Sequence, residues 1–311
     1  MISTWTQRLL LFVKGMAMGA ADIVPGVSGG TIAFISGIYD ELILTLRNLH
    51  PRLLWSLPKQ GWRATWQEAN LTFLLTLLAG ILTSVFTLAK GISWVLEHYP
   101  AILWSFFMGL VLASSWLVSR QVSHWQRDTY AGLLLGILIG WLATQGIAIH
   151  LEATPVTLFI GGAIAICAMI LPGISGSFLL LLLGLYQPVI HAVKQLQLDT
   201  LMVFAAGCIV GLLAFSRLLH WLLHTHRAVT LAMLTGFMLG ALGKVWPWKV
   251  TRVYRIDEHG QSLPLLQDNV LPGVYESMTG QVAMFGQVSL AFAVGMLVVV
   301  IIAWVANKRV H

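Results

Sequence analysis

Long apolar stretches separated by short polar segments run along almost the whole chain. Windows of about nineteen residues predict six uninterrupted membrane-spanning helices, at residues 71–96, 101–119, 130–148, 201–223, 229–246 and 283–305. The stretches are continuous rather than alternating in polarity, which excludes a transmembrane β-barrel. The pattern therefore predicts an all-α polytopic membrane protein.

Two further apolar regions, 9–46 and 157–192, are interrupted near their middle by Pro, Gly and Ser. We expect each region to form a pair of half-length helices around a loop, either re-entrant or spanning as a discontinuous helix. The regions are copies of each other. PGVSGG at 25–30 aligns with PGISGS at 172–177, and GIY at 37–39 aligns with GLY at 184–186, both at the same offset along the chain.

The repetition continues beyond the broken regions at a second constant offset, which is smaller because the first half has a longer loop. The matching pairs are Gly80 and Gly207, Lys90 and Arg217, Trp94 and Trp221, and Gly109 and Gly236. The chain is therefore an internal duplication, with repeat 1 at 1–150 and repeat 2 at 151–311. Each repeat holds one broken pair and three full spans, an odd number of crossings, so we expect the repeats to have inverted topology.

Composition supports the membrane assignment and excludes a soluble domain. Of the 311 residues, 58% are hydrophobic and 10% are charged, whereas soluble domains carry about 25% charged residues. Mean hydropathy is +0.82. The formal net charge of +6 comes from residues scattered between the spans rather than from one basic stripe, so we expect no nucleic-acid partner.

The basic residues predict the orientation in the membrane. Most of those between the spans fall on the side of the amino terminus, whereas the other side carries Lys194, Lys249, Arg252 and Arg255. The positive-inside rule then places both termini in the cytoplasm. The Trp-rich segment 47–70 suits a cytoplasmic interfacial helix. Segment 248–282 is expected to be a polar outer loop that either covers an entrance or has no specific role.

A helix that breaks inside hydrocarbon must have its free backbone groups satisfied by protein, water or ligand, so each break predicts a site. Backbone amides at the start of the following half-helix, with Ser or Thr hydroxyls beside them, form a nest that attracts phosphate or carboxylate. The alternative is a Pro-Gly kink packed against its neighbours. The candidate phosphate-binding residues are Gly26, Ser28, Gly29, Gly30, Thr31, Gly173, Ser175, Gly176 and Ser177.

Charged residues within the apolar regions add further candidates, because a charge at the bilayer centre is costly. Lys90 and Arg217 occupy equivalent repeat positions and would either bind an anion or extend to lipid headgroups. Asp22 lies just before the first break and has Met169 as its repeat partner. We expect Asp22, and less strongly Glu41, to bind a coupling proton or sodium ion; the alternative for Asp22 is capping of local amides.

Other chemistry finds no support in the sequence. Cys167 and Cys208 have no metal-ligand neighbours, and the histidines lack the spacing of a metal site, so neither a metal nor a resident cofactor is expected. The first motif superficially resembles a membrane phosphatase signature, yet that chemistry needs a histidine nucleophile and none lies in or beside either copy. Nucleotide loops and hydrolase motifs are absent, so an enzyme is not expected.

GMAMGAADIVPGVSGGT at 15–31, together with LPGISGS at 171–177, resembles the bacterial and archaeal polyprenyl-phosphate transporter family PopT. The similarity extends over nearly the whole chain. It implies a multi-pass protein of the bacterial cytoplasmic membrane that moves undecaprenyl phosphate from the outer to the cytoplasmic leaflet, recycling this carrier for cell-envelope synthesis.

The residues agree with that implication, because paired nests suit a phosphate headgroup while an isoprenoid tail stays in lipid. Alternating exposure of the site would follow from rocking of the two repeats. A carrier of small soluble anions, or an enzyme that acts on polyprenyl phosphates, remains the alternative. The sequence leaves open the coupling ion, the lipid length, the direction of flux and the oligomeric state, a homodimer included.

Overall fold

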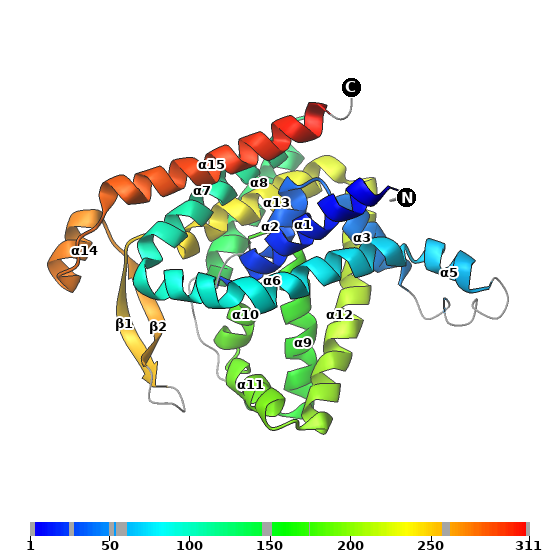
Figure 1. Ribbon diagram of the computed structural model, residues 1–311, viewed down its shortest axis with the longest axis horizontal. Helices are drawn as coiled ribbons and strands as arrows, with labels where there is room; N and C mark the ends of the chain where they lie inside the picture. The colour runs from blue at the N-terminus through cyan, green and yellow to red at the C-terminus, as the bar shows by residue number, and fades with distance from the viewer. Residues whose placement is uncertain are drawn as a thin grey trace.

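The molecule is mostly helical, as the apolar pattern predicts (Figure 1). The computed structural model describes residues 4–24, 28–49, 53, 61–144, 151–173, 175–256 and 262–308. Its first half contains helices α1 (Trp5–Ile23), α2 (Gly29–Ile35), α3 (Tyr39–Asn48), α5 (Trp62–Glu68), α6 (Leu71–His98), α7 (Pro100–Ser119) and α8 (Arg127–Thr144). Its second half contains α9 (Pro155–Ile170), α10 (Gly176–Leu182), α11 (Tyr186–Lys194), α12 (Leu198–Thr225), α13 (Arg227–Gly240), the 3₁₀ turn η1 (Ala241–Val245), β1 (Lys249–Ile256), β2 (Ser262–Asn269), α14 (Pro272–Thr279) and α15 (Phe285–Lys308).

Within the described ranges, five helices are long and apolar enough to cross a membrane: α6, α7, α12, α13 with η1, and α15. The sixth expected span, 130–148, corresponds to α8. This helix is not in that set, because its 18 residues begin with Arg127 and Asp128, and residues 145–148 lie outside the described part.

The two broken regions differ from the expected pair of half-helices. Each contains three helices, one of 19 or 16 residues followed by two short ones. The short helices are bent by 118° between α2 and α3, and by 110° between α10 and α11. Gly37 and Gly184, at φ of +70° and +74°, form the bends. A residue without a Cβ is favoured at that φ, so the sequence marked two breaks in each region where we expected one.

The internal duplication is visible in the element boundaries. Helix α10 begins and ends at the positions that the first offset makes equivalent to the ends of α2, and the second offset relates α12 to α6 in the same way. Equivalent helix pairs also cross at equivalent glycines. A Cβ at Gly80 would overlap the carbonyl oxygen of Phe12, and a Cβ at Gly207 would overlap that of Phe159. Small residues let helix backbones approach closely in membranes, and here both repeats use them at the same place.

The two halves are joined by an exchange of helix pairs. Helix α7 packs along α15 from the second half, and α13 packs along α8 from the first half. The division at residue 150 and the inverted orientation of the repeats therefore remain predictions about the sequence units, while the packed core combines both halves. This core includes Phe73, Leu77, Leu231 and Met238, which are almost completely buried.

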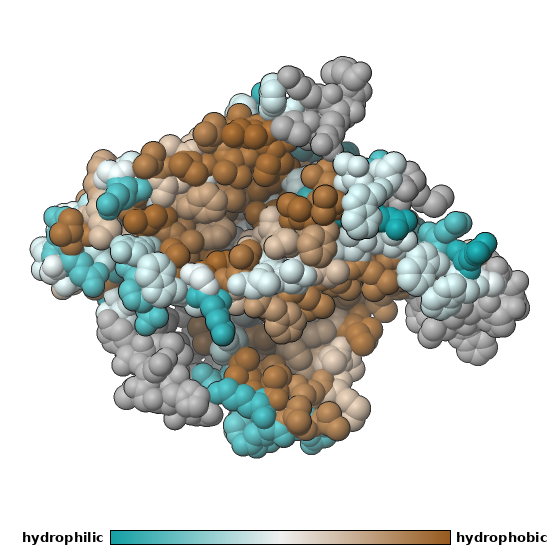
Figure 2. Space-filling model, in the orientation of Figure 1, coloured by the Kyte–Doolittle hydropathy of each residue, from teal (hydrophilic) through white to brown (hydrophobic). Residues whose placement is uncertain are grey.

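Large apolar side chains cover much of the outer surface. Figure 2 shows hydrophobic residues spread over the face formed by α15, where Leu290, Leu297 and Trp304 are more than half exposed. A soluble protein rarely exposes so large an apolar patch, so this surface suits contact with lipid. Composition, helix length and the apolar surface thus all support a multi-pass membrane protein.

The expected outer loop, 248–282, contains two strands and a helix. Strands β1 and β2 pair antiparallel as a hairpin, with Lys249 opposite Asn269, and α14 follows. Trp248 anchors this unit, because its indole N–H donates to the carbonyl of Ala283 at 2.9 Å. In Figure 1 the hairpin and α14 lie at the opposite end of the molecule from α5.

Candidate functional site

The first break lies between α1 and α2, and its amides are already bonded within the chain. Asp22 Oδ1 accepts a hydrogen bond from the Gly29 N–H at 2.7 Å. The N-cap Ser28 accepts from the Gly30 N–H through Oγ at 3.1 Å. The local capping that we considered for Asp22 is therefore present. Gly26, a candidate phosphate-binding residue, lies outside the described residues.

The second break lies between α9 and α10 and is arranged differently. Gly173 has φ of +92°, and its N–H donates to Thr31 Oγ1 at 3.0 Å. The hydroxyls of Ser175 and Ser177 lie 2.8 Å apart and bond each other. Ser175 makes no side-chain cap bond to α10. It therefore does not accept from the first amides of α10 in the way that Ser28 accepts from the Gly30 N–H of α2.

The two breaks contact each other directly. Ser28 Oγ lies 3.1 Å from the carbonyl oxygen of Met169 and 3.0 Å from that of Leu171, within donating distance of either. The Tyr39 hydroxyl donates to the carbonyl of Ile170 at 3.2 Å. The last carbonyls of a helix have no partner within it, so residues of the first broken region satisfy the end of α9.

Buried hydroxyls distinguish this junction from an ordinary helix contact. Ser28 and Thr31 are fully buried, and Ser175 is 6% exposed. The structure thus brings both motif copies to one place between the repeats. Their role in binding phosphate remains a prediction, because in this arrangement the amides of Gly29 and Gly30 are bonded to the chain's own oxygens.

The cations and the second carboxylate that we singled out lie elsewhere. Lys90 is exposed on α6. The Arg217 guanidinium is exposed and donates to the carbonyl of Leu213, one turn earlier on α12, at 2.7 Å. Glu41 accepts from Asn70 Nδ2 at 3.1 Å. None of the three forms a described hydrogen bond or ion pair with the motif residues.

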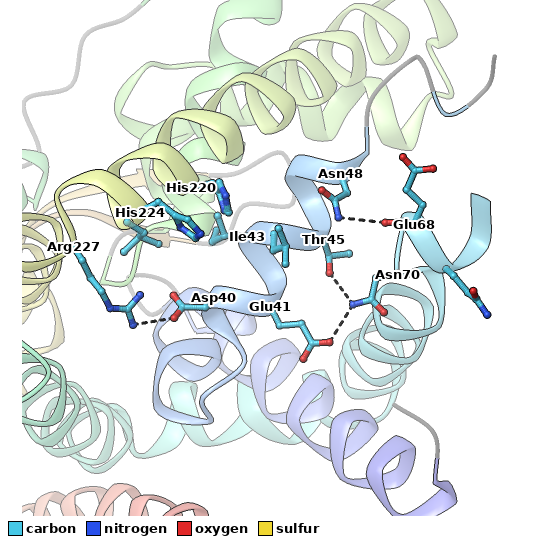
Figure 3. A pocket seen from close by; sticks show the side chains of 13 residues that line it. Asp40, Glu41, Ile43, Thr45, Asn48, Glu68, Asn70, His220, His224 and Arg227 are labelled. Carbon is cyan, nitrogen blue, oxygen red and sulfur yellow. Dashed lines mark hydrogen bonds and ion pairs between the residues drawn. The ribbon is translucent and has the colours of Figure 1, made fainter. Parts of the chain in front are cut away.

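A polar pocket of about 580 Å³ opens between α3 and the carboxyl end of α12 (Figure 3). Asp40 and Arg227 form an ion pair at 3.0 Å on one side of it, and the Glu41–Asn70 bond lies on the other. His220 and His224 project from α12, with ring centroids 4.1 Å apart. The pocket therefore combines acidic groups from repeat 1 with basic groups from repeat 2.

An adjoining pocket of about 730 Å³ is more basic, because Arg47 and Arg217 line it together with His220 and His224. Arg47 Nη1 lies 2.6 Å from His220 Nε2. A guanidinium has donors only, so His220 must present an unprotonated Nε2 to it. Arg217 thus joins a cluster of basic groups at this end of α12, away from the two breaks.

Sequence reasoning missed Tyr39, Arg47, His220 and Arg227 as site residues. Their contacts join α3 to α9, α12 and α13, helices that come from different halves of the chain. No local pattern marks such a contact. Among the described residues, no group of three His, Cys, Asp or Glu side chains is placed to hold a metal ion.

Comparisons with known proteins match the sequence of this chain to one family. Residues 18–263 match the family model described as undecaprenyl phosphate translocase-like. The chain is similar to a polyprenyl-phosphate transporter of Vibrio cholerae serotype O1, with 51% identity over 273 residues, covering 88% of this chain and 89% of the relative. It is also similar to a polyprenyl-phosphate transporter of Staphylococcus aureus, with 30% identity over 260 residues, covering 78% and 87%. No solved structure matches the chain.

Proposed function

This chain belongs to the undecaprenyl phosphate translocase-like family, and from that membership we propose that it transports polyprenyl phosphate across the bacterial cytoplasmic membrane. The family is one of transporters rather than enzymes. The finer proposal is that undecaprenyl phosphate moves from the outer to the cytoplasmic leaflet, with both termini in the cytoplasm. The excess of basic residues on the side of the amino terminus supports that orientation.

The meeting of the two breaks is the observation that carries the mechanism. Ser28 reaches the carbonyl end of α9, and Gly173 reaches Thr31, so the same hydrogen bonds that join the repeats would have to change when the repeats move. We propose that the phosphate headgroup binds here in another state, held by amides and hydroxyls of both copies. Alternating access by relative motion of two repeats follows.

The position of Asp22 supports coupling of phosphate binding to the binding of a proton or sodium ion. Its carboxylate occupies the Gly29 N–H, which is one of the amides that a phosphate would use. Protonation of Asp22, or sodium binding to it, weakens that acceptor and releases the amide. The coupling ion and the phosphate then favour the same state, which is the differential affinity that a population shift requires.

Release of the headgroup is assigned to the pockets between α3 and α12. Arg47, Arg217 and Arg227 line them with His220 and His224. Arg binds phosphate through a fork of donors. Because these cations are exposed, water competes with them for the anion, so the anion binds weakly and is released. The orientation proposed above places these pockets on the cytoplasmic side.

Leaflet exchange of a labelled polyprenyl phosphate in proteoliposomes tests the proposal. The intact protein should exchange the lipid faster than empty liposomes. The Ser28→Ala, Ser175→Ala double variant should be slower by about tenfold or more, because a buried group left without its partner costs about 1–3 kcal/mol. A Ser119→Ala, Ser277→Ala double variant, which removes hydroxyls that bond only within α7 and α14, should exchange at the rate of the intact protein.

Two other outcomes would decide against the proposal. If inorganic phosphate or a dicarboxylate competes as well as a short-chain polyprenyl phosphate, the protein carries small soluble anions. If the purified protein releases inorganic phosphate from the lipid, it is an enzyme. Absence of exchange under any applied proton or sodium gradient would equally remove lipid translocation.

A further inference from the structure

A third pocket, of about 510 Å³, lies where the β-hairpin meets the carboxyl ends of α8 and α13. The hairpin strands that line it lie on the opposite side of the molecule from α5 in Figure 1. Its lining is Trp141, Thr144, Gly243, Lys244, Lys249, Arg252, Gln267, Asp268 and Asn269. Three of these residues are basic and one is acidic.

The two lysines are held over aromatic rings rather than in solvent. Lys244 Nζ lies 3.7 Å from the ring centroid of Phe178, and Lys249 Nζ lies 4.1 Å from that of Trp104. Lys249 also donates to the backbone carbonyl of Lys244. These contacts fix both ammonium groups at the pocket while leaving N–H donors on each of them unused.

The pocket holds more positive than negative charge. Arg252 forms an ion pair with Asp268. Within the described part of the chain, neither Lys244 nor Lys249 has a carboxylate partner. Partly buried charges are costly unless they are paired, and a ring contact compensates only part of that cost. Two neighbouring lysines without counter-ions favour binding of an anion with two negative charges.

The surroundings of the pocket favour an anion that carries an apolar tail. Trp141 lines the pocket and is half exposed, and Leu138 and Leu134 lie one and two turns earlier on α8, also at least half exposed. Residues at this spacing share one face of a helix. Helix α8 thus presents an apolar track that ends at the lysines, with a Trp at the junction, where amphipathic aromatic rings are favoured.

The pocket also adjoins the second break. Phe178, which lies under the Lys244 ammonium, follows Ser177 in α10. A Cβ at Gly173 would lie 3.2 Å from the Met238 Cα and 3.5 Å from the Ala241 Cβ, so the second break packs on the helix that leads to Lys244. An anion at the lysines is therefore near the motif copy whose hydroxyls cap no amide.

We propose that Lys244 and Lys249 form a separate binding site for the phosphomonoester headgroup of a lipid whose isoprenoid tail lies along α8. The proposal rests on the proposed function for the lipid and for the orientation, which places this pocket on the outer side. The site captures the headgroup before it reaches the junction of the two breaks.

Equilibrium binding to the purified full-length protein tests the site, with farnesyl phosphate, farnesol and inorganic phosphate as separate probes. In the Lys244→Met, Lys249→Met double variant the Kd for farnesyl phosphate should rise by about tenfold or more, since hydrogen bonds to charged groups contribute about 1.5–3 kcal/mol. Methionine keeps an unbranched side chain over each ring. Arg63→Met, on the exposed face of α5, removes a cation elsewhere and should leave the Kd unchanged.

Each outcome separates this site from the proposed function. An unchanged Kd in a double variant that retains the thermal unfolding of the intact protein overturns the site, whatever the exchange assay shows. Equal affinity for inorganic phosphate and farnesyl phosphate overturns the lipid ligand. If the intact protein does not exchange lipid but the variant still loses farnesyl phosphate binding, the site stands and the transport proposal fails.

The pH dependence of binding supplies an independent prediction. Burial and the nearby charge of Lys244 lower the pKa of Lys249 from 10.5 to about 7. The other charged groups that line this pocket are Arg252 on its own strand and Asp268 on β2. Lys249 is cationic below its pKa, so its contribution to anion affinity should be present below about pH 7 and be lost as the pH rises through that value.

Titration from pH 7 to 9 checks this prediction, because a phosphomonoester is already mostly a dianion in that range. The difference in farnesyl phosphate affinity between the intact protein and a Lys249→Met variant should shrink as the pH rises. A difference that stays constant over the range would show that the Lys249 charge does not contribute to binding.

Discussion

Replacing Gly236 by Leu is expected to prevent the protein from reaching its folded state. Gly236 lies where α13 crosses α8, and a Cβ there would overlap the carbonyl oxygen of Leu133. Overpacking costs about 1–3 kcal/mol and occasionally more, and the cost is at the high end here because backbone cannot move aside as a flexible side chain can. The yield of monodisperse protein in detergent, and its thermal unfolding, should both fall sharply.

A matched variant controls for the substitution itself. A Cβ at Gly91 on α6 would meet nothing within 4 Å, so Gly91→Leu adds the same apolar side chain to a helix without a clash and should fold normally. Gly109→Leu should resemble Gly236→Leu, because a Cβ at Gly109 would overlap the carbonyl oxygen of Phe292 on α15. Normal stability of both tight-site variants would mean that these helices do not cross at the described distances.

The equivalence of Gly109 and Gly236 could be predicted from the sequence, because the repeat conserves the glycines that close helix crossings require. Gly109 and Gly236 have the same separation along the chain as Gly80 and Gly207, and in the structure both pairs lie at equivalent crossings. Composition and apolar run length likewise predicted the long helices, since a bilayer demands about 20 apolar residues. Equal spacing could not show which half supplies the partner helix, so the exchange of α8 and α15 between halves was not predicted.

The internal geometry of the broken regions was only partly predictable. Pro25 and Pro172 drew attention to one interruption in each region, whereas Gly37 and Gly184, used only to align the repeats, mark the bends of 118° and 110°. A single glycine in an apolar run is tolerated within many helices, so its φ is decided by packing. The placement of α3 against α12 follows from those bends, and with it the basic pockets.

The β-hairpin was not predicted from the sequence, for a different reason. Lys249 to Ile256 mixes polar and apolar residues in a segment that follows a membrane span, and its Pro, Gly and acidic neighbours favour a loop. Strand pairing with Ser262–Asn269 is a non-local choice. Position next to a break, by contrast, is a local property: the sequence places Asp22 just before the first break, and its carboxylate bonds to Gly29 just after it.

Replacing Asp22 by Asn is expected to uncouple transport from an ion gradient while leaving the fold intact. The amide oxygen of Asn can still accept from the Gly29 N–H, which the carboxylate binds at 2.7 Å, but a neutral acceptor holds it less tightly than a charged one. It also offers no site for a proton and little for sodium. Gradient-driven uptake of polyprenyl phosphate should fall to the rate measured without a gradient, and lipid binding should lose its dependence on the coupling ion.

Asp199→Asn is the matched control, because Asp199 is exposed in the first turn of α12 and its carboxylate is remote from the breaks. Its uptake should keep the gradient response of the intact protein. Asp22→Ala goes further than Asp22→Asn, since it leaves the Gly29 N–H without its acceptor and should lower stability by about 1–3 kcal/mol. If Asp22→Asn instead retains the full gradient response, the carboxylate is only a cap for α2, and the ion must act through another group.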